Sequence, residues 1–275
     1  MLRRILSAAT AAVVARRTYD ALRQGPSADR WSRTNHRGET VTLAEGPAVA
    51  AGSLAGLLVS ARTGGSTSAA VLAVAGASAL GALDDLAGAT DVKGLRGHLT
   101  ALRDGQVTTG TMKLAGLVTT GLVAGALARR GRGGVVDAVL AGGVVAGSAN
   151  LVNLLDLRPG RATKSFLIAS AAPLVSSGQA SSAAFGNSVA APAGAAAALV
   201  AEDLGERAML GDTGANALGA AWGVGAAASM RRPALLATLG AIVALTVASE
   251  RVSFSGVIDR TPALRRIDQF GRRPA

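Results

Sequence analysis

Charge-free apolar blocks, separated by short charged stretches, constrain the fold of this chain more than any other feature. The longest block, Ser165–Ala201, has 37 residues without a charged side chain, and Thr63–Leu83 is a second clear block. An apolar helix needs about 20 residues to cross a bilayer, so the longer block has room for two spans. The sequence therefore predicts an all-α fold, a polytopic membrane helix bundle.

We expect about nine transmembrane helices, with a turn near Ser176–Asn187 that divides the longest block. The first apolar segment is short and is also compatible with a signal peptide, but we favour a retained, partly interfacial helix with snorkelling arginines. Residues 1–250 then form one transmembrane domain, and residues 251–275 form a basic cytoplasmic tail. The expected spans are Ile5–Ala15, Gly46–Ala61, Thr63–Leu83, Val107–Ala128, Val135–Leu155, the two halves of Ser165–Ala201, Thr213–Met230 and Pro233–Ser249.

The distribution of positive charge predicts the orientation of the bundle. Of the 28 Lys and Arg residues, 20 fall in segments 16–45, 84–113, 156–164 and 202–212 and in the tail, against 8 on the opposite side. The richer side is expected in the cytoplasm, which places the protein in the cytoplasmic (inner) cell membrane. The net charge of +11 then needs no nucleic acid partner, because basic residues flank apolar spans and aromatic residues are only 3%.

Three acidic motifs are expected to meet on this cytoplasmic side. Asp84 and Asp85 end one apolar block, Asp156 ends N-L-V-N-L-L-D, and Asp212 lies in L-G-D-T-G-A-N-A-L-G. Adjacent carboxylates repel each other unless a cation or a shared proton relieves them. A solvated helix end is the simpler interpretation of one such motif alone. However, 16 of the 17 acidic residues lie on this side, so the three motifs can form one active site on the cytoplasmic face.

Oxygen ligands beside lysines at a membrane face suit magnesium and a pyrophosphate. The amides of Asn150 and Asn153 and the ammonium groups of Lys93 and Lys113 lie in the same loops and helix ends as the carboxylates. Helix–helix hydrogen bonding in lipid is the alternative role of the two asparagines. The chain has no cysteine and only two histidines, which excludes a thiolate site and a histidine-rich zinc site.

These motifs resemble those of the polyprenyl-phosphate N-acetylhexosamine-1-phosphate transferases, which include the phospho-N-acetylmuramoyl-pentapeptide transferases and GlcNAc-1-phosphate transferases. G-A-L-D-D-L is similar to their aspartate pair, N-L-V-N-L-L-D to their N-x-x-N-x-x-D-G motif, and L-G-D-T-G-A-N-A-L-G to their G-D-x-G-S motif. The T-N-H-R-G stretch resembles the start of their first cytoplasmic loop, so the resemblance runs from about Trp31 to Gly219. It implies magnesium-dependent transfer of a sugar-1-phosphate from a nucleotide sugar to a polyprenyl phosphate in cell-envelope glycan synthesis.

The resemblance also implies roles for individual residues. Those that match its catalytic positions are Asp84, Asp85, Asp156 and Lys113. Those that match substrate-binding positions are Asn150, Asn153, Lys93 and His36. The magnesium ligands it implies are Asp212 and Asp85. Arg161 and Lys164 are expected to be inside-facing anchors and not ligands. A homodimer is compatible with this assignment.

Two departures from the family pattern keep a second interpretation open. Pro159 stands where the family has a second Asp, which helps to hold a uracil base, and the tail has no histidine where the family has a histidine-rich loop. The alternative is a non-catalytic relative that binds lipid phosphate or scaffolds envelope-assembly proteins. A transporter is less compatible, because it would place carboxylates within spans, whereas these acids cluster at span ends.

Overall fold

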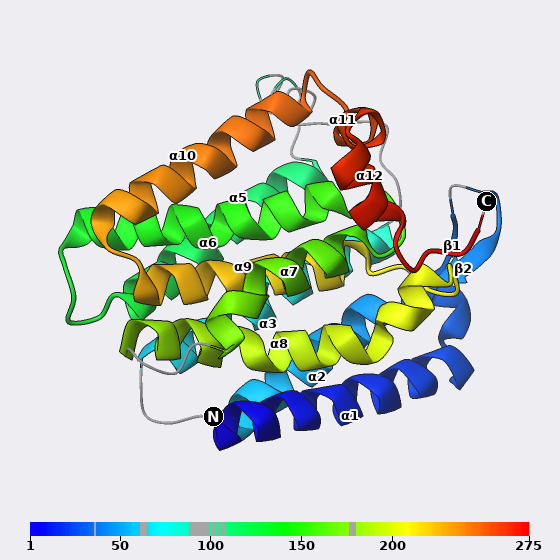
Figure 1. The fold of residues 1–275 in the computed structure, drawn as a ribbon, viewed down its shortest axis with the longest axis horizontal. Helices are drawn as coiled ribbons and strands as arrows, with labels where there is room; N and C mark the ends of the chain where they lie inside the picture. The colour runs from blue at the N-terminus through cyan, green and yellow to red at the C-terminus, as the bar shows by residue number, and fades with distance from the viewer. Residues whose placement is uncertain are drawn as a thin grey trace.

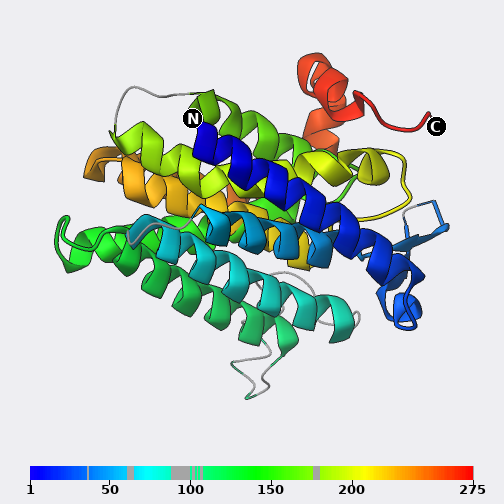
Figure 2. The ribbon, with the colours of Figure 1, turned by 90° about the horizontal axis from the view of Figure 1, so that it is seen from below.

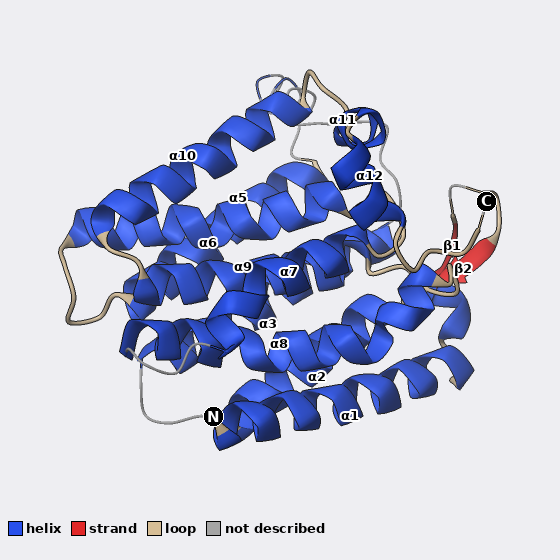
Figure 3. Cartoon of the chain, viewed as in Figure 1, coloured by secondary structure: helices blue, strands red, loops and turns tan. Residues whose placement is uncertain are grey.

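The computed structural model describes residues 1–35, 37–60, 65–87, 100, 103, 105, 108–175 and 180–274. Within these residues the fold is helical apart from one two-stranded hairpin, which agrees with the all-α prediction. The long helices lie side by side along one direction (Figures 1 and 3). The N-terminus lies at one end of the bundle, and the hairpin and the C-terminus lie at the other (Figure 1).

The bundle is built from helices that alternate in direction along the chain. They are α1 (Leu2–Gln24), α2 (Glu45–Val59), α3 (Gly65–Ala87), α5 (Thr109–Ala128), α6 (Val135–Leu155), α7 (Arg161–Val175), α8 (Ala180–Leu204), α9 (Gly211–Ser229) and α10 (Arg232–Ser249). Between α1 and α2 lie the 3-10 helix η1 (Ala28–Trp31) and the antiparallel strands β1 (Ser32–Thr34) and β2 (Thr40–Thr42). Two short helices, α11 (Phe254–Arg260) and α12 (Pro262–Gln269), follow α10.

Helix α9 forms the centre of the bundle, in contact with α3, α6 and α8. Fifteen of its 19 residues are buried. Its glycines allow neighbouring backbones to approach closely: a Cβ at Gly219 would collide with the backbone of Ser148 on α6, and one at Gly223 would lie 2.6 Å from the Cα of Val145. Small residues at helix contacts are typical of membrane bundles, and the glycines of α9 serve this close packing.

Among the described residues, five helices are long and apolar enough to cross a membrane. They are Gly65–Ala87, Gly110–Ala128, Val135–Leu155, Ala183–Leu204 and Arg232–Ser249. Each of the nine segments expected from the sequence contains a helix, but nine spans are not established. Helices α2 and α7 have only 15 residues each. Helix α9 carries polar residues and is covered by other helices, so it does not need an apolar surface that faces lipid.

The expected boundaries of the first helix and the first loop were wrong. Helix α1 continues past Ala15 to Gln24, because its polar second half packs on α8. Arg16 donates hydrogen bonds to the Glu202 carboxylate (2.9 Å) and to the carbonyl of Ala198 (2.7 Å), and Tyr19 is buried. The stretch expected to be a polar loop, residues 16–45, therefore contains the end of a helix, η1 and the hairpin.

The C-terminal segment packs on the bundle through ion pairs. Arg161 of α7 lies 2.8 Å from Oδ1 of Asp268 on α12, and both side chains are nearly fully buried, at 4% and 6% exposed. Arg272 donates to the same carboxylate at 2.7 Å, and Lys164 donates to the carbonyls of Ile267 and Phe270. Arg161 and Lys164 thus hold the C-terminal segment in place.

Candidate active site

Four helices bring predicted site residues together at one end of the bundle. Helix α3 ends just after Asp84 and Asp85, and α6 ends just after Asn153. Lys113 lies in the first two turns of α5, and Asp212 is the second residue of α9. Because successive helices alternate in direction, these two C-termini and two N-termini meet at the end that carries the hairpin in Figure 1.

Lys113 lies at the centre of this group of side chains. Its ammonium lies 3.2 Å from Oδ2 of Asp84 and also forms an ion pair with Oδ2 of Asp212. With the Asn153 amide oriented to satisfy both neighbours, its nitrogen donates to Asp212 Oδ1 (2.9 Å) and its oxygen accepts from Lys113 (3.1 Å). The Asp84 and Asp212 side chains are 30% and 25% exposed, so a ligand can reach them, while partial burial strengthens their charge interactions.

Asp85 has an environment different from that of its neighbour Asp84. Its carboxylate accepts hydrogen bonds from the backbone N–H groups of Asp212 (3.0 Å) and Thr213 (2.9 Å) and from the Thr213 hydroxyl (2.6 Å). The first N–H groups of a helix have no partner within that helix, so Asp85 caps α9 from a different helix. Arg33 donates to the backbone carbonyl of Asp85. The two adjacent acids therefore have separate partners.

Two glycines allow α3 and α9 to meet in this way. Gly211 has a φ of +62°, in the left-handed region that favours glycine, and a Cβ there would lie 3.1 Å from both carboxylate oxygens of Asp85. A Cβ at Gly81 of α3 would collide with the backbone of Asp212. The glycines of the two motifs are thus required where the acidic helix ends approach each other.

Asp156 and Asp203 form a second acidic group beside the first. Burial and the negative charge of Asp203 raise the pKa of Asp156 well above its usual range, although the backbone N–H of Gly211 opposes this shift by hydrogen bonding. Asp203 is buried and accepts hydrogen bonds from the Gly160 N–H (2.8 Å) and the Thr163 hydroxyl (3.1 Å). A small cavity of about 50 Å³ lies against both carboxylates.

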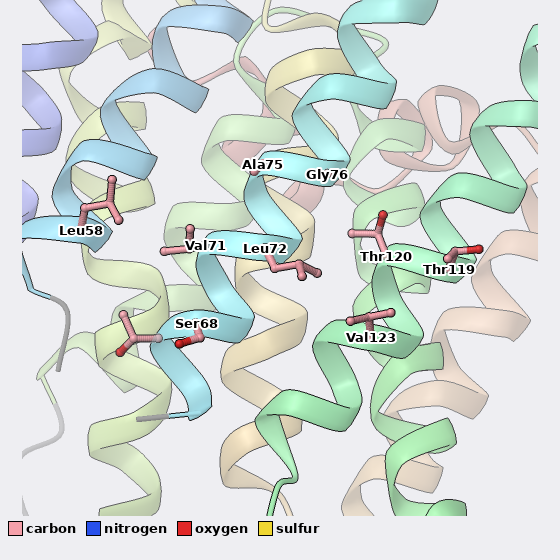
Figure 4. A pocket seen from close by; sticks show the side chains of 10 residues that line it. Leu58, Ser68, Val71, Leu72, Ala75, Gly76, Thr119, Thr120 and Val123 are labelled. Carbon is pink, nitrogen blue, oxygen red and sulfur yellow. The ribbon is translucent and has the colours of Figure 1, made fainter. Parts of the chain in front are cut away.

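An apolar groove of about 620 Å³ lies along α2, α3 and α5 (Figure 4). Its lining includes Leu58, Val71, Leu72 and Val123, with Thr120 as one of its few polar side chains. On α3 the groove ends at Gly76, eight residues before Asp84, which is about 12 Å along a helix. The groove and the acidic cluster therefore share helices α3 and α5.

The oxygen atoms around Lys113 are candidate ligands for a metal ion. Two carboxylates and one amide oxygen, from Asp84, Asp212 and Asn153, already surround the positive charge of this ammonium. Within the described ranges, no three acidic or histidine side chains converge closely enough to hold a metal ion by themselves. Magnesium commonly keeps several waters and takes substrate phosphates as ligands. The carboxylates left to ligate a magnesium ion are thus those of Asp84 and Asp212, which now pair with Lys113, whereas the Asp85 oxygens are engaged with α9.

The remaining predicted residues lie apart from the cluster or outside the described residues. Asn150 lies one turn before Asn153 on α6 and makes no hydrogen bond to the cluster in the part of the chain that is described. Lys93 and His36 fall outside the described residues. Sequence reasoning missed Thr213 and Arg33. A hydroxyl residue directly after Asp212 at a helix start is a capping signal for Thr213, whereas Arg33 meets Asp85 only through the fold.

The sequence matches no protein-family model and no curated protein sequence.

Proposed function

We propose that this protein is a magnesium-dependent membrane transferase that moves a sugar-1-phosphate from a nucleotide sugar to a polyprenyl phosphate, at the cytoplasmic face of the inner membrane. The observation that carries this proposal is the convergence of Asp84, Lys113, Asn153 and Asp212 from four helices. Simple solvated helix ends need not converge on one ammonium group. Polar groups that meet in this way at a partly buried position are characteristic of a functional site.

The reaction forms one P–O bond and breaks another. An oxygen of the lipid phosphate attacks the sugar-linked phosphorus, and the bond between this phosphorus and the bridging oxygen breaks. The products are a polyprenyl diphosphate sugar and a nucleoside monophosphate. Asp84 is the carboxylate suited to orient the acceptor, or to take a proton from it if the acceptor carries one, because Asp85 is engaged with α9.

The charge of the cluster explains why a divalent cation is needed. The carboxylates of Asp84 and Asp212 pair with the ammonium of Lys113, and the Asp85 carboxylate lies close by, at the start of α9, so a bare diphosphate would be repelled. Asp212 and Asp84 would hold the magnesium ion, which when bound withdraws charge from phosphoryl oxygens. The ammonium of Lys113, on its flexible side chain, would then be free to pair with a substrate phosphate.

The groove along α2, α3 and α5 supports a long apolar acceptor. An isoprenoid chain whose phosphate lies beside Asp84 and Lys113 would reach the groove after about 12 Å along α3. Burial of the isoprenoid chain in the groove would add to its binding affinity without any hydrogen bond to the chain. The pairing of a phosphate-binding cluster with such a groove favours a lipid phosphate over a soluble acceptor.

Radiolabel transfer from a panel of nucleotide sugars to undecaprenyl or decaprenyl phosphate tests the proposal. Purified protein in liposomes should form labelled lipid only when magnesium is present. Asp212→Asn and Lys113→Met should abolish transfer, while Asp29→Asn, which alters an exposed acid outside the cluster, should retain it. Transfer that persists in Asp212→Asn with unchanged magnesium dependence would remove Asp212 from the site.

One observation favours the non-catalytic alternative. Arg272 donates a hydrogen bond to the carbonyl of Pro159 (2.8 Å), at the position where the family has an Asp, and the adjacent cavity has only about 50 Å³. Small-molecule sites usually have roughly 300 Å³ or more. Folded protein that transfers no sugar phosphate, yet binds polyprenyl phosphate in a manner that depends on Asp84 and Lys113, would identify a lipid-phosphate-binding relative.

A further inference from the structure

Helices α11 and α12 expose large apolar side chains to the surroundings. Leu264 and Ile267 of α12 are 44% and 50% exposed, and Phe270, directly after the helix, is 78% exposed. Leu264 and Ile267 are three residues apart and share one helix face, whereas Arg265, Arg266 and Gln269 lie on the other. Helix α12 is therefore amphipathic, with its apolar face uncovered among the described residues.

The C-terminal segment that carries this apolar face also carries unpaired positive charge. Four exposed residues of the segment form no ion pair within the part of the chain that the structure describes; they are Arg251, Arg260, Arg265 and Arg266. Arg272 and Arg273, by contrast, pair with Asp268 and Glu39. Exposed apolar residues beside unpaired arginines are the composition of helices that lie in the interface of a membrane.

The position of α11 and α12 matches the boundary of a bilayer. Helix α10 is a candidate span that buries only Leu235 and Ile242, so most of its surface is free to face lipid. Only residues 250–253 separate its end from α11, so α11 begins close to the membrane surface. Helix α12 runs across the direction of the long helices in Figure 1, and both short helices lie beside the bundle in Figure 2.

The ion pairs of Asp268 fix the rotation of α12 about its axis. Arg161 Nε and Arg272 Nη2 donate to the buried Asp268 carboxylate at 2.8 and 2.7 Å. Lys164 donates to the carbonyls of Ile267 and Phe270 at 3.0 and 3.1 Å. With Asp268 held against the bundle, the apolar face of α12 cannot rotate into the protein, so it stays exposed on the described chain.

We propose that α11 and α12 lie in the interface of the membrane, with Leu264, Ile267 and Phe270 among lipid acyl chains and the four unpaired arginines on anionic lipid headgroups. The bilayer is the occupant that the surface fits, because the adjoining helix α10 is itself a candidate span. Positive charge next to an apolar face complements a negatively charged lipid surface. This inference does not depend on the transfer reaction.

Single-cysteine labelling tests this placement, since the chain has no cysteine of its own. Ile267→Cys would carry the fluorophore NBD on the apolar face, and Gln269→Cys would carry it on the polar face as the matched control. The full-length protein is placed, one molecule per disc, in nanodiscs of phosphatidylcholine alone or with phosphatidylglycerol. Thermal unfolding followed by tryptophan fluorescence confirms that each labelled variant is folded.

We expect NBD at position 267 to emit at a shorter wavelength than at 269 and to be quenched about two-fold more by a lipid with a spin label on its acyl chain. Phosphatidylglycerol should enlarge this difference, and the variant R265E/R266E should remove the enlargement. Equal quenching at 267 and 269 in both lipids would overturn the proposal. A blue shift that appears only in discs with two protein molecules would also overturn it, in favour of a second copy. No effect of phosphatidylglycerol would overturn the role of the arginines.

Discussion

The carboxylate of Asp85 caps helix α9 at Thr213, where it accepts both the backbone N–H (2.9 Å) and the side-chain hydroxyl (2.6 Å). Asp85 lies near the end of α3, and Thr213 lies in the first turn of α9. A carboxylate at a helix N-terminus stabilises it by hydrogen bonding and by its interaction with the helix dipole. This contact joins two of the acidic motifs and fixes the position of Asp212 relative to Asp84.

Replacing Thr213 tests this cap. Thr213→Val keeps the shape of the side chain and removes the hydroxyl donor, so it should lower the free energy of unfolding by about 1 kcal/mol. Asp85→Ala removes all three acceptor contacts and should cost about 1–2 kcal/mol or more. Thermal unfolding in detergent, followed by tryptophan fluorescence, measures both. Thr213→Ser is the matched control and should stay near wild type; equal stability of Thr213→Val and wild type would contradict the role of the hydroxyl.

The sequence predicted the meeting of Asp84, Lys113, Asn153 and Asp212, because alternating helices return to the same end of a bundle. It could not predict which of two adjacent carboxylates faces the lysine. Asp84 and Asp85 follow each other on one helix and point in directions about 100° apart, so the neighbours of each depend on how α3 is rotated against α9. That rotation is decided by packing at Gly81, which the motif alone does not reveal.

Gly81 gives a second prediction. A Cβ at this position would collide with the Asp212 backbone, so Gly81→Ala should push α3 away from α9 and cost about 1–3 kcal/mol of stability. Because Asp212 would move with α9, the variant should lose magnesium-dependent transfer even at temperatures where it remains folded. Gly240→Ala on α10 is the control: a Cβ there meets nothing within 4 Å, and alanine favours a helix by about 1 kcal/mol. Similar behaviour of the two variants would argue against the close α3–α9 contact.

Asp156 gives a prediction about pH. Burial and the charge of Asp203 raise the pKa of Asp156 in the folded protein, so the folded state holds this proton more tightly than the unfolded state. The stability that this proton contributes is full below the pKa of the unfolded state, and it is lost as the pH rises from there through the pKa of the folded state. Asp156→Asn removes the titration and keeps an acceptor for the Gly211 N–H, so the variant should be more stable than wild type, by a margin that grows with pH.

Unfolding of the Asp156→Asn variant and wild type across a pH series measures this margin. The margin should be smallest in acid, where wild-type Asp156 is protonated, and the variant should lose transfer activity if Asp156 belongs to the catalytic group. Asp29→Asn, at an exposed position, should show no such trend. A margin that shrinks as pH rises would contradict the raised pKa.

The contacts of the C-terminal segment could not be predicted from the sequence. Arg161 and Asp268 are separated by more than a hundred residues, and each lies among other charges that suggest only a solvated surface. The pattern predicted that Arg161 is an inside-facing anchor, and it gave no sign that Arg161 is buried in an ion pair with Asp268. The two residues are buried together because α7 and α12 meet at the same end of the bundle, a long-range property of the fold.

The Arg161–Asp268 pair gives the last prediction. Asp268→Asn leaves the buried Arg161 without its counter-charge, so it should cost about 3–5 kcal/mol. Arg161→Met should cost less, because Arg272 still pairs with Asp268. The double variant should cost clearly less than the sum, because no unpaired charge remains between these two positions. Arg207→Met is the control, because it also removes an arginine that pairs with a carboxylate, that of Glu202. Arg207 is 54% exposed, and ion pairs at exposed positions contribute about 0–1 kcal/mol. Additive losses in the double variant would show that Arg161 and Asp268 do not stabilise each other.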